Sequence, residues 1–456
     1  MDDYQTFLES KRKSIPDTGF EPDMSKFPKE MFDYQRDVTS WGLKKGRCAI
    51  FLGTGAGKSL CQLTWADQVC NHTGGDVLVL APLAVAPQTV REGLKFGVDV
   101  NYCRSQSGVK PGINITNYEM LEHFDTHHFD GVVLDEAGIL KNFSGKTRNQ
   151  IIDSFCRTRY KLSCTATPSP NDHMELGNQC EFLGVMNYSE MLATYFVHDG
   201  GETAKWRVKG HAVESFWQWV ASWAVMMQNP RDLGYNGDMF DLPPLNMVQH
   251  TVIPKTSRFQ GRGVAKTLND RRDARRESLD ERVAKAAEIV NGSDETFVCW
   301  TGLNAESVAL TKLIPGAVEV TGSDKPEYKE KMSMEFIDGN IRVLVTKGEI
   351  FGMGLNWQHC HNMIFCGLSD SFELLYQSIR RCWRFGQEYP VNVHVITSEA
   401  EGAVVKNIKE KETRFNEMLK GMISASQEIT KENIRGSFRQ SDDYNPQEKM
   451  VVPSWI

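Results

Sequence analysis

Residues 52–59 read Leu-Gly-Thr-Gly-Ala-Gly-Lys-Ser, and this stretch decides how the chain is expected to fold. It follows an apolar run, residues 48–52, and precedes a segment whose apolar residues recur at helical spacing. Glycines let consecutive backbone N–H groups curl around a phosphate, and the N-terminus of a helix adds partial positive charge. Lys58 would reach the outer phosphate oxygens, and the Ser59 hydroxyl would ligate Mg²⁺. The stretch therefore predicts a nucleotide-phosphate site between a strand and a helix.

The predicted phosphate loop departs from the general pattern at one position. A glycine is usual five positions before Gly57, and this chain has Leu52 there. The tighter Thr-Gly-x-Gly-Lys-Ser form is intact, so we expect the backbone cradle to form. A glycine-rich turn without a ligand is the alternative, and the strand-loop-helix context argues against it. The expected nucleotide-binding residues of the loop are Thr54, Gly55, Ala56, Gly57, Lys58 and Ser59.

A second motif supplies two carboxylates. Residues 129–136 read Phe-Asp-Gly-Val-Val-Leu-Asp-Glu, an apolar strand that ends in an acidic pair. At the carboxyl end of a parallel strand, Asp135 would hold Mg²⁺ through its water shell. Glu136 would orient and deprotonate the attacking water. An acidic pair alone is weak evidence, but together with the phosphate loop it predicts phosphoryl transfer, with ATP as substrate and Mg²⁺ as cofactor.

The composition is that of a folded globular protein. The chain has 456 residues, of which 40% are hydrophobic and 24% are charged, which excludes a wholly disordered or collagen-like chain. It has no apolar run of the ~18–20 residues that cross a bilayer, and its acidic start does not resemble a secretory signal. We therefore expect a soluble, cytoplasmic protein that does not bind membranes.

The cysteines indicate a reducing environment. There are eleven, and no two form a Cys-x-x-Cys pair. The cluster of His359, Cys360 and His361 with Cys366 suggests a metal site, but zinc requires two spaced ligand pairs that converge on one tetrahedron. We predict buried thiols beside a strand at these positions, and no structural zinc.

Two parts of the chain alternate short β-rich runs with helical patterns. This alternation predicts the α/β class, with parallel sheets covered by helices on both faces. The expected strands are residues 48–52, 76–81, 113–117, 131–134 and 160–163, and then 296–300, 317–320, 341–346, 361–366 and 391–396. The expected organisation is an N-terminal arm (1–30), a first lobe (31–180), a helical insertion and linker (181–290), a second lobe (291–400), and a helical tail with a flexible end (401–456). One helical face of the tail would pack on the body through Val404, Ile408, Phe415, Met418, Leu419 and Met422.

The acidic motif and several later motifs resemble the superfamily 2 helicase-like ATPases, specifically their Swi/Snf-like branch. Residues 135–142, Asp-Glu-Ala-Gly-Ile-Leu-Lys-Asn, resemble the branch's acidic box, and residues 165–171, Thr-Ala-Thr-Pro-Ser-Pro-Asn, resemble its third motif. Residues 351–356 and 377–387 match later motifs in order and spacing. The resemblance covers roughly residues 31–400. It implies two tandem RecA-like lobes, and the lack of accessory modules is similar to compact phage or bacterial members.

The resemblance also assigns roles to individual residues. It implies that Tyr34 and Gln35 read adenine. The residues that would couple hydrolysis to lobe movement are Thr165, Thr167, Gly354 and Asn356. Two departures stand out. Gly138 replaces the histidine of the acidic box, and residues 368–372 lack the Trp-Asn-Pro of chromatin remodelers.

Three residues of the last motif are spaced to act together. Gln377, Arg381 and Arg384 fall at intervals of four and three, which places them on one face of a helix. From the second lobe, the two guanidinium groups would reach the γ-phosphate across a cleft, and such an arginine finger is worth ~10³–10⁵ in rate. The alternative is an arginine pair bound to surface carboxylates, which the upstream phosphate loop makes the weaker interpretation.

Binding of nucleic acid is expected to be directed at the sugar-phosphate backbone. The candidate hydroxyl contacts are Thr116, Thr321 and Thr346, and ordinary strand threonines are an equally weighted alternative. The net charge is −7, whereas residues 255–285 carry ten basic and five acidic side chains and form a possible duplex-facing patch. Trp206, Trp217, Trp219 and Trp223 could stack on bases, but their helical spacing favours core packing.

These observations predict an ATP-driven DNA translocase or helicase whose lobes close on Mg·ATP and open after hydrolysis. Binding to duplex or branched DNA would be independent of sequence. An RNA helicase is a second hypothesis of the same class. A nucleic-acid clamp that uses ATP only as a switch is a third, suggested by Gly138 and Leu52.

Overall fold

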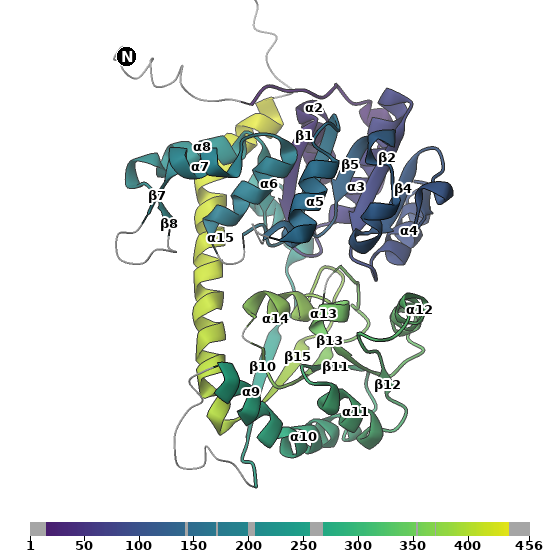
Figure 1. Ribbon diagram of the computed structural model, residues 1–456, viewed down its shortest axis with the longest axis vertical. Helices are drawn as coiled ribbons and strands as arrows, with labels where there is room; N and C mark the ends of the chain where they lie inside the picture. Colours follow the sequence, from purple (N-terminus) through teal and green to yellow (C-terminus); the bar gives the residue numbers. More distant parts are fainter. Residues whose placement is uncertain are drawn as a thin grey trace, which may run out of the picture.

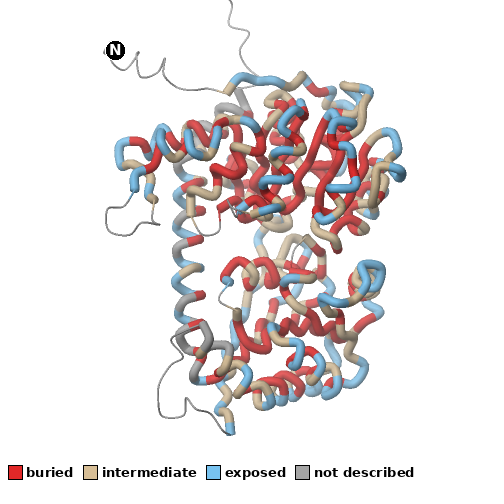
Figure 2. The backbone as a smooth tube through the Cα atoms, in the orientation of Figure 1, coloured by how far each residue is buried: buried red, intermediate tan, exposed pale blue. Residues whose placement is uncertain are grey.

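The computed structural model describes residues 15–141, 145–169, 172–198, 206–255, 268–352, 354–369 and 371–436. The chain forms two lobes, each built around a parallel sheet, which lie one above the other in Figure 1. Most strands of the two sheets are buried on both faces, as the red tube in Figure 2 shows. Parallel strands are buried on both faces when helices pack on each side, so they appear in the sequence as continuous apolar runs.

The first lobe contains a seven-stranded sheet in the order β3-β4-β2-β5-β6-β1-β9, with every neighbouring pair parallel. The strands are β1 (Arg47–Leu52), β2 (Asp76–Ala81), β3 (Val100–Tyr102), β4 (Ile113–Asn117), β5 (Phe129–Leu134), β6 (Tyr160–Cys164) and β9 (Ala224–Met227). One apolar cluster packs α2 (Asp33–Lys45), α3 (Lys58–Thr73) and α4 (Ala86–Lys95) on one face. A second cluster packs α5 (Lys146–Ser154), α6 (Leu176–Leu183), α7 (Tyr188–Tyr195) and α8 (Val213–Ala221) on the other. A small antiparallel hairpin, β7 (Phe196–His198) with β8 (Trp206–Val208), projects from this second face.

The second lobe contains a six-stranded sheet in the order β10-β15-β14-β11-β13-β12, again entirely parallel. Its strands are β10 (Leu245–Val252), β11 (Phe297–Thr301), β12 (Val318–Glu319), β13 (Val343–Lys347), β14 (Asn362–Cys366) and β15 (Val391–Ser398). Its helices are α9 (Leu268–Glu277), α10 (Leu279–Asn291), α11 (Asn304–Leu313), α12 (Pro326–Ile337), α13 (Gly348–Phe351) and α14 (Phe372–Ile379).

The long helix α15 (Gly402–Gly436) joins the two lobes a second time. It runs beside both lobes in Figure 1 as the yellow helix. Near its start, Val404, Ile408 and Phe415 pack into the core of the second lobe. Further along, Met422 and Ile434 pack into the two apolar clusters of the first lobe. The tail was expected to pack on the body, and it does so on both lobes at once. The Met418 side chain and residues 437–456, which were expected to be flexible, lie outside the described residues.

The predicted α/β class with two parallel sheets is confirmed, and each expected strand has a counterpart within a few residues. The structure differs within residues 181–290, which were expected to be a helical insertion and linker. Strand β9 of this segment extends the first sheet beside β1, and β10 extends the second sheet beside β15. Both are edge strands. Strand β9, Ala-Val-Met-Met, is apolar and buried but only four residues long, and β10 has a largely exposed surface.

The N-terminal arm is also more ordered than expected over residues 15–30. Backbone N–H groups of Thr18, Gly19 and Phe20 donate to carbonyls at the end of α2. The Phe20 ring stacks on His72 with ring centroids 3.8 Å apart, and Phe27 is buried. The arm is therefore part of the first lobe from residue 15 onward.

Most of the described tryptophans and cysteines take core positions, and Cys156 is exposed. Trp217, Trp219 and Trp223 are buried in the first lobe, which confirms core packing for them, and Trp206 is half-buried in β8. Cys360 and Cys366 are buried thiols. Within the described ranges, no group of three or more His, Cys, Asp or Glu side chains is placed to hold a metal ion. No helix in those ranges is both long and apolar enough to span a membrane.

Candidate active site

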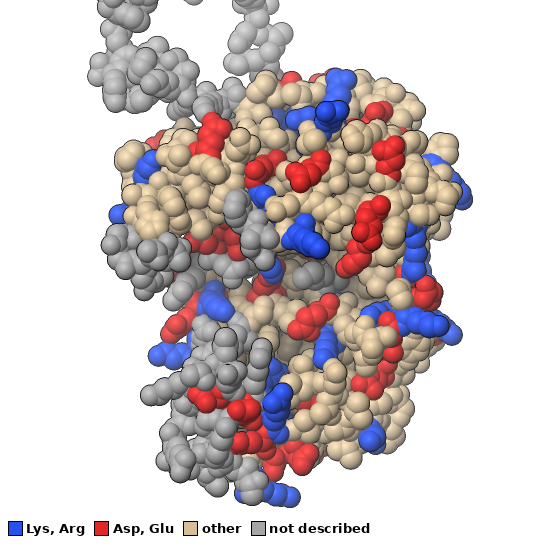
Figure 3. Space-filling model, viewed as in Figure 1, with Lys and Arg blue, Asp and Glu red and all other residues tan. Residues whose placement is uncertain are grey.

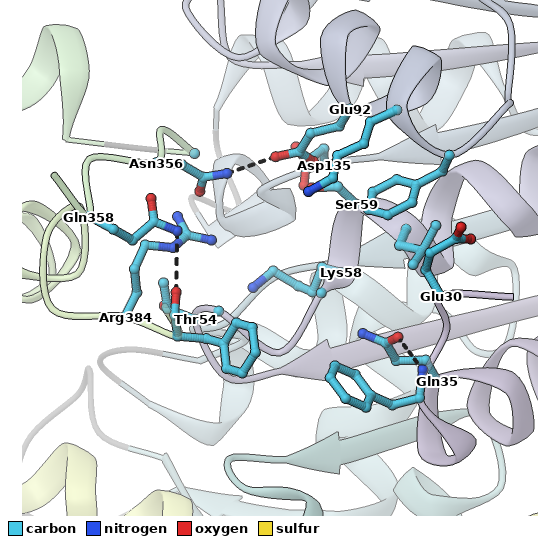
Figure 4. A pocket seen from close by; sticks show the side chains of 18 of the residues that line it. Glu30, Gln35, Thr54, Lys58, Ser59, Glu92, Asp135, Asn356, Gln358 and Arg384 are labelled. Atoms are coloured by element: carbon cyan, nitrogen blue, oxygen red, sulfur yellow. Dashed lines mark hydrogen bonds between the residues drawn. The ribbon is translucent and has the colours of Figure 1, made fainter. Parts of the chain in front are cut away.

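A cavity of about 240 Å³ lies between the two lobes and is lined by residues from both. The first lobe contributes the phosphate loop, the acidic pair and part of α4. The second lobe contributes residues of the 354–358 loop and the segment that follows α14. Figure 4 shows Lys58, Asp135 and Arg384 arranged around this space. On the face shown in Figure 3, acidic and basic side chains are interspersed around the groove between the lobes.

The phosphate loop joins β1, which ends at Leu52, to α3, which begins at Lys58. Gly55 and Gly57 have φ angles of 87° and 74°, a region that favours glycine. A Cβ atom on Gly55 would lie 2.7 Å from the backbone N of Phe385, so the second lobe approaches the loop at a point that only glycine permits. The Leu52 side chain is fully buried in the first lobe, and its carbonyl accepts a hydrogen bond from Lys58 Nζ at 3.1 Å.

The acidic pair begins where β5 ends. Asp135 Oδ1 accepts hydrogen bonds from Gln62 Nε2 at 2.8 Å and from the backbone N of Glu136 at 3.1 Å. Burial raises the pKa of the Asp135 carboxyl group, and the neighbouring Glu136 carboxylate raises it further. Burial also lowers the pKa of Lys58, an effect that the Glu136 and Asp135 carboxylates oppose. Phosphate-binding and acidic residues therefore form one electrostatic unit in a poorly hydrated space.

Glu136 has an unusual backbone. Its φ angle of 52° is the only positive value at a non-glycine position among the described residues. Left-handed backbone at such a residue costs of order 1–3 kcal/mol and persists where the surrounding structure enforces it, often at functional sites. Tyr118 Oη donates to the Asp135 carbonyl at 2.7 Å and so fixes the peptide group before Glu136. With this backbone conformation, the consecutive residues Asp135 and Glu136 both line the cavity at the end of β5.

Two threonines of the third motif connect the acidic pair to the second lobe. Thr165 Oγ1 lies 3.5 Å from Glu136 Oε2, to which it donates, and accepts the N–H of Thr167 at 3.1 Å. Gln377 Nε2 of the second lobe donates to Thr167 Oγ1 at 3.4 Å. The link between the acidic box and the third motif is therefore made by Glu136 and Thr165 directly, without the histidine that Gly138 replaces.

A carboxylate of the second lobe faces the position of Gly138. A Cβ atom on Gly138 would lie 3.5 Å from Glu373 Oε1. Glu373, which is buried in α14, forms an ion pair with Lys141 at the end of the acidic box. The place beside the glycine is thus taken by an interlobe ion pair.

The two arginines of the last motif line the cavity, but not as residues of one helix. Gln377 belongs to α14, which ends at Ile379, and Arg381 and Arg384 follow in turns. The chain turns there because the Arg381 carbonyl accepts the N–H of Trp357 at 2.9 Å. The expectation of one shared helical face is therefore wrong, although all three side chains still reach the interface between the lobes.

Both guanidinium groups are held by the same acceptor. Arg381 Nη1 and Arg384 Nη1 donate to the Leu355 carbonyl at 3.1 and 2.9 Å. Arg381 is 1% exposed, and burial together with the nearby Arg384 lowers its pKa to about 10. In the part of the chain that the structure describes, no carboxylate lies within 4 Å of either group, so the alternative of a surface ion pair does not describe them.

The expected adenine-reading residues lie at one end of the cavity. Gln35 lines it, and Tyr34 is buried behind the phosphate loop. Tyr34 Oη and Gln35 Nε2 both donate to the Ala56 carbonyl, at 2.8 and 3.2 Å. The rings of Phe32 and Phe385, 6.1 Å apart, come from different lobes and also line this end. Tyr34 therefore supports the loop, while Gln35 and the aromatic rings face the space.

The cavity includes residues that the sequence did not single out as part of a site. They are Glu30, Phe32, Leu60, Glu92, Lys95, Phe96, Gln358 and Phe385. Glu92 and Gln88 carried the clearest signal, since two polar residues four apart follow the Ala-Pro-Leu motif on one helical face. Phe32 carried no signal, and Phe385 lies in the 377–387 motif but was assigned no role, because the two rings meet only across the interface between the lobes.

The candidate nucleic-acid contacts are placed differently from one another. Thr116 and Thr346 are fully buried within the two sheets, and Thr346 Oγ1 donates to the Val320 carbonyl at 3.0 Å. Thr321 is half-buried and shares a hydrogen bond with Ser323. Of these three hydroxyl groups, the one of Thr321 is nearest to solvent in this conformation. The contacts themselves stay a prediction.

The 351–356 motif contacts the first lobe closely. Gly354 has a φ angle of 76°, and a Cβ atom there would lie 2.0 Å from Val85 Cγ2 at the start of α4. Asn356 Nδ2 donates to Glu92 Oε1 at 2.7 Å, the hydrogen bond drawn between the labelled residues in Figure 4. Both expected coupling residues of this motif therefore lie at the interface between the lobes.

Comparison with known proteins agrees with this arrangement. Residues 58–198 match the SNF2-related domain, a range that begins at Lys58 and contains the acidic pair and the third motif. No curated protein matches the chain. The lysine, the two carboxylates and the two threonines described above all fall within the matched range, while the second lobe provides the arginines. Over residues 58–198 the chain is therefore similar to the SNF2-related domain.

Proposed function

We propose that the protein is an ATP-dependent DNA translocase whose two lobes close over one Mg·ATP. One observation carries the proposal. A single cavity is lined by a phosphate-loop lysine and an acidic pair from the first lobe and by two arginines from the second lobe. Phosphoryl transfer requires mainly positioning and charge neutralisation, and this set of side chains supplies both.

In the proposed reaction each lobe contributes a different part. Lys58 binds the outer phosphate oxygens, and Glu136 accepts the proton of the attacking water on its carboxylate. Arg381 and Arg384 stabilise the charge that develops on the transferred phosphoryl group. Because these arginines come from the second lobe, hydrolysis proceeds only when the lobes are closed, and this dependence links turnover to lobe movement.

The residues present fit a magnesium ion. Ser59 and Asp135 line the same cavity, and hydroxyl and carboxylate oxygens suit Mg²⁺, which commonly takes one or two carboxylates together with phosphate oxygens. When bound, the ion neutralises part of the charge of the triphosphate. Ser59 at the start of α3 and Asp135 after β5 would hold it from two sides.

DNA is proposed as the track because of the SNF2-related domain and the resemblance of the later motifs to the Swi/Snf-like branch. The branch mostly moves along duplexes without unwinding them, so duplex translocation is the first expectation. Backbone contacts of this kind are independent of sequence and weaken as salt is raised.

The test compares steady-state ATP hydrolysis with duplex DNA, single-stranded DNA, RNA and no nucleic acid, each with Mg²⁺ and with the metal chelated. We expect hydrolysis that needs Mg²⁺ and is stimulated most by duplex DNA, followed by displacement of a triplex-forming strand. Stimulation by RNA alone would make the protein an RNA helicase. Tight ATP binding without multiple turnover would make it a switch-type clamp.

A further inference from the structure

One peptide group in the second lobe is held from both sides of the interface. The carbonyl of the Leu355–Asn356 peptide accepts hydrogen bonds from Arg381 and Arg384 at 3.1 and 2.9 Å. The N–H of the same peptide donates to Gln88 Oε1 of α4 at 3.0 Å. The orientation of this peptide plane therefore determines where both guanidinium groups find their common acceptor, and a side chain of the first lobe fixes that orientation.

A second residue of α4 completes the contact. Glu92 Oε1 accepts from Asn356 Nδ2 at 2.7 Å and from Gln88 Nε2 at 2.9 Å. Gln88 and Glu92 are four residues apart and so lie on one face of the helix, one turn apart. Asn356 is thus held at its backbone by Gln88 and at its side chain by Glu92, and the two α4 residues hold each other. Figure 4 shows Glu92 and Asn356 meeting beside Arg384 and Asp135.

We propose that Gln88 and Glu92 are positioning residues that set Arg381 and Arg384 for hydrolysis through the Leu355–Asn356 peptide. Hydrogen bonds in a chain polarise one another, so an acceptor such as Gln88 Oε1 at the N–H strengthens the carbonyl of the same peptide as an acceptor. The Glu92 carboxylate also attracts Arg384, opposing the fall in the pKa of that guanidinium that burial causes. Neither α4 residue needs to touch the reacting phosphoryl group for this effect.

The same contact offers a route by which nucleic acid would stimulate hydrolysis, and here the inference rests on the proposed function. Helix α4 directly follows Ala81-Pro82-Leu83, a motif that resembles strand-contacting segments. A shift of α4 on binding nucleic acid would move Gln88 and Glu92 together, because they share one helix face. The Leu355–Asn356 peptide, and with it both arginines, would follow.

The experiment measures kcat and KM for ATP, with and without duplex DNA, for the full chain carrying Gln88→Met, Glu92→Ala or Glu92→Gln. Misplacement of a reacting group by about 1 Å can cost on the order of 10²-fold in rate, so we expect kcat to fall between about tenfold and a hundredfold for Gln88→Met and Glu92→Ala. KM for ATP should stay within about twofold of wild type, because the arginines act mainly in the transition state. Glu92→Gln keeps an acceptor oxygen, so its kcat should stay much closer to that of wild type than the kcat of Glu92→Ala.

Arg91→Ala is the matched control. Arg91 lies on the same helix and also pairs across the interface, with Asp338 at 2.9 Å, but it does not reach the peptide. Its kcat should stay within about twofold of wild type. A second readout separates positioning from general loosening of the fold. In an Arg384→Ala background, Gln88→Met should lower kcat much less than it does in the wild-type chain, because residues that act together are not additive.

The outcomes are distinguishable. If the wild-type chain does not hydrolyse ATP, the proposed function fails and the inference fails with it. If the wild type hydrolyses ATP but Gln88→Met and Glu92→Ala keep its kcat, only the inference is overturned. A rise in KM without a change in kcat, or the same loss in the Arg384→Ala background, would also overturn it.

Discussion

Gln377 of the second lobe donates a hydrogen bond from Nε2 to Thr167 Oγ1 of the first lobe, at 3.4 Å. Thr167 is joined through its N–H to Thr165, whose hydroxyl group lies 3.5 Å from the Glu136 carboxylate. Three hydrogen bonds therefore connect the end of strand β5 to helix α14. Because the path crosses the interface, it exists only when the lobes are closed.

This path predicts the effect of removing one hydroxyl group. Thr167→Val keeps the shape of the side chain and removes its hydrogen bond, which is worth about 0.5–1.5 kcal/mol, or roughly two- to tenfold in rate. We expect DNA-stimulated hydrolysis to fall by about this factor, with the basal rate changing less. Thr194→Val removes an exposed hydroxyl group that bonds only within α7 and serves as the control. Unchanged stimulation in Thr167→Val would show that the path does not couple the lobes.

Two glycines with open surroundings predict opposite effects of the same substitution. A Cβ atom on Gly421 or on Gly74 would meet nothing within 4 Å. Gly421 lies within helix α15, so Gly421→Ala should stabilise the protein by about 0.5–1 kcal/mol. Gly74 ends α3 with a φ angle of 73°, so Gly74→Ala should destabilise it by about 1–2 kcal/mol. Thermal unfolding should show a higher midpoint for the first variant and a lower one for the second. Two shifts of the same sign would contradict the assignment.

A buried lysine predicts a pH-dependent stability. Lys161 in β6 is 2% exposed, its Nζ donates to the Phe182 carbonyl at 2.9 Å, and burial lowers its pKa to about 8. The pKa of a lysine in the unfolded chain is ~10.4. When the pKa is lower in the folded protein, the lysine destabilises the fold increasingly as the pH falls from the unfolded-state pKa to the folded-state pKa.

Lys161→Met should therefore unfold at a higher temperature than wild type at pH 7, and the difference should shrink as the pH is raised from about 8 toward 10. Lys45→Met is a control, because the Lys45 side chain is also largely buried but its Nζ forms an ion pair with Asp17. A difference between Lys161→Met and wild type that does not change with pH would contradict the role of the lysine charge.

The sequence predicted the central strands because each is buried on both faces and so is a continuous apolar run, as with 48–52 and 76–81. It did not predict β9 or β10, since β9 is an apolar run of only four residues and β10 is largely exposed. It predicted the phosphate loop, the acidic pair and the arginines because their chemistry depends on local order.

The interlobe contacts could not be predicted in this way. The pairing of Gln88 with the Asn356 N–H joins residues 268 positions apart, and that of Lys141 with Glu373 joins residues 232 apart. Neither pair leaves a local pattern. Arg381 and Arg384 were expected in the cleft, but the reason given, one shared helical face, was wrong, because α14 ends at Ile379. The reach of these side chains depends on a turn held by Trp357, which lies elsewhere in the lobe.

In the proposed mechanism, Arg381 of the second lobe acts on a triphosphate bound to the first lobe. Single-turnover hydrolysis of Mg·ATP by Arg381→Ala, at saturating duplex DNA, tests this most directly. Arg380→Ala is the matched control, since its guanidinium stacks 4.4 Å from the Trp383 ring and does not line the cavity. We expect Arg381→Ala to bind ATP nearly as well as wild type but to hydrolyse it roughly 10³-fold more slowly, while Arg380→Ala stays close to wild type. Hydrolysis by Arg381→Ala at the wild-type rate would contradict this mechanism.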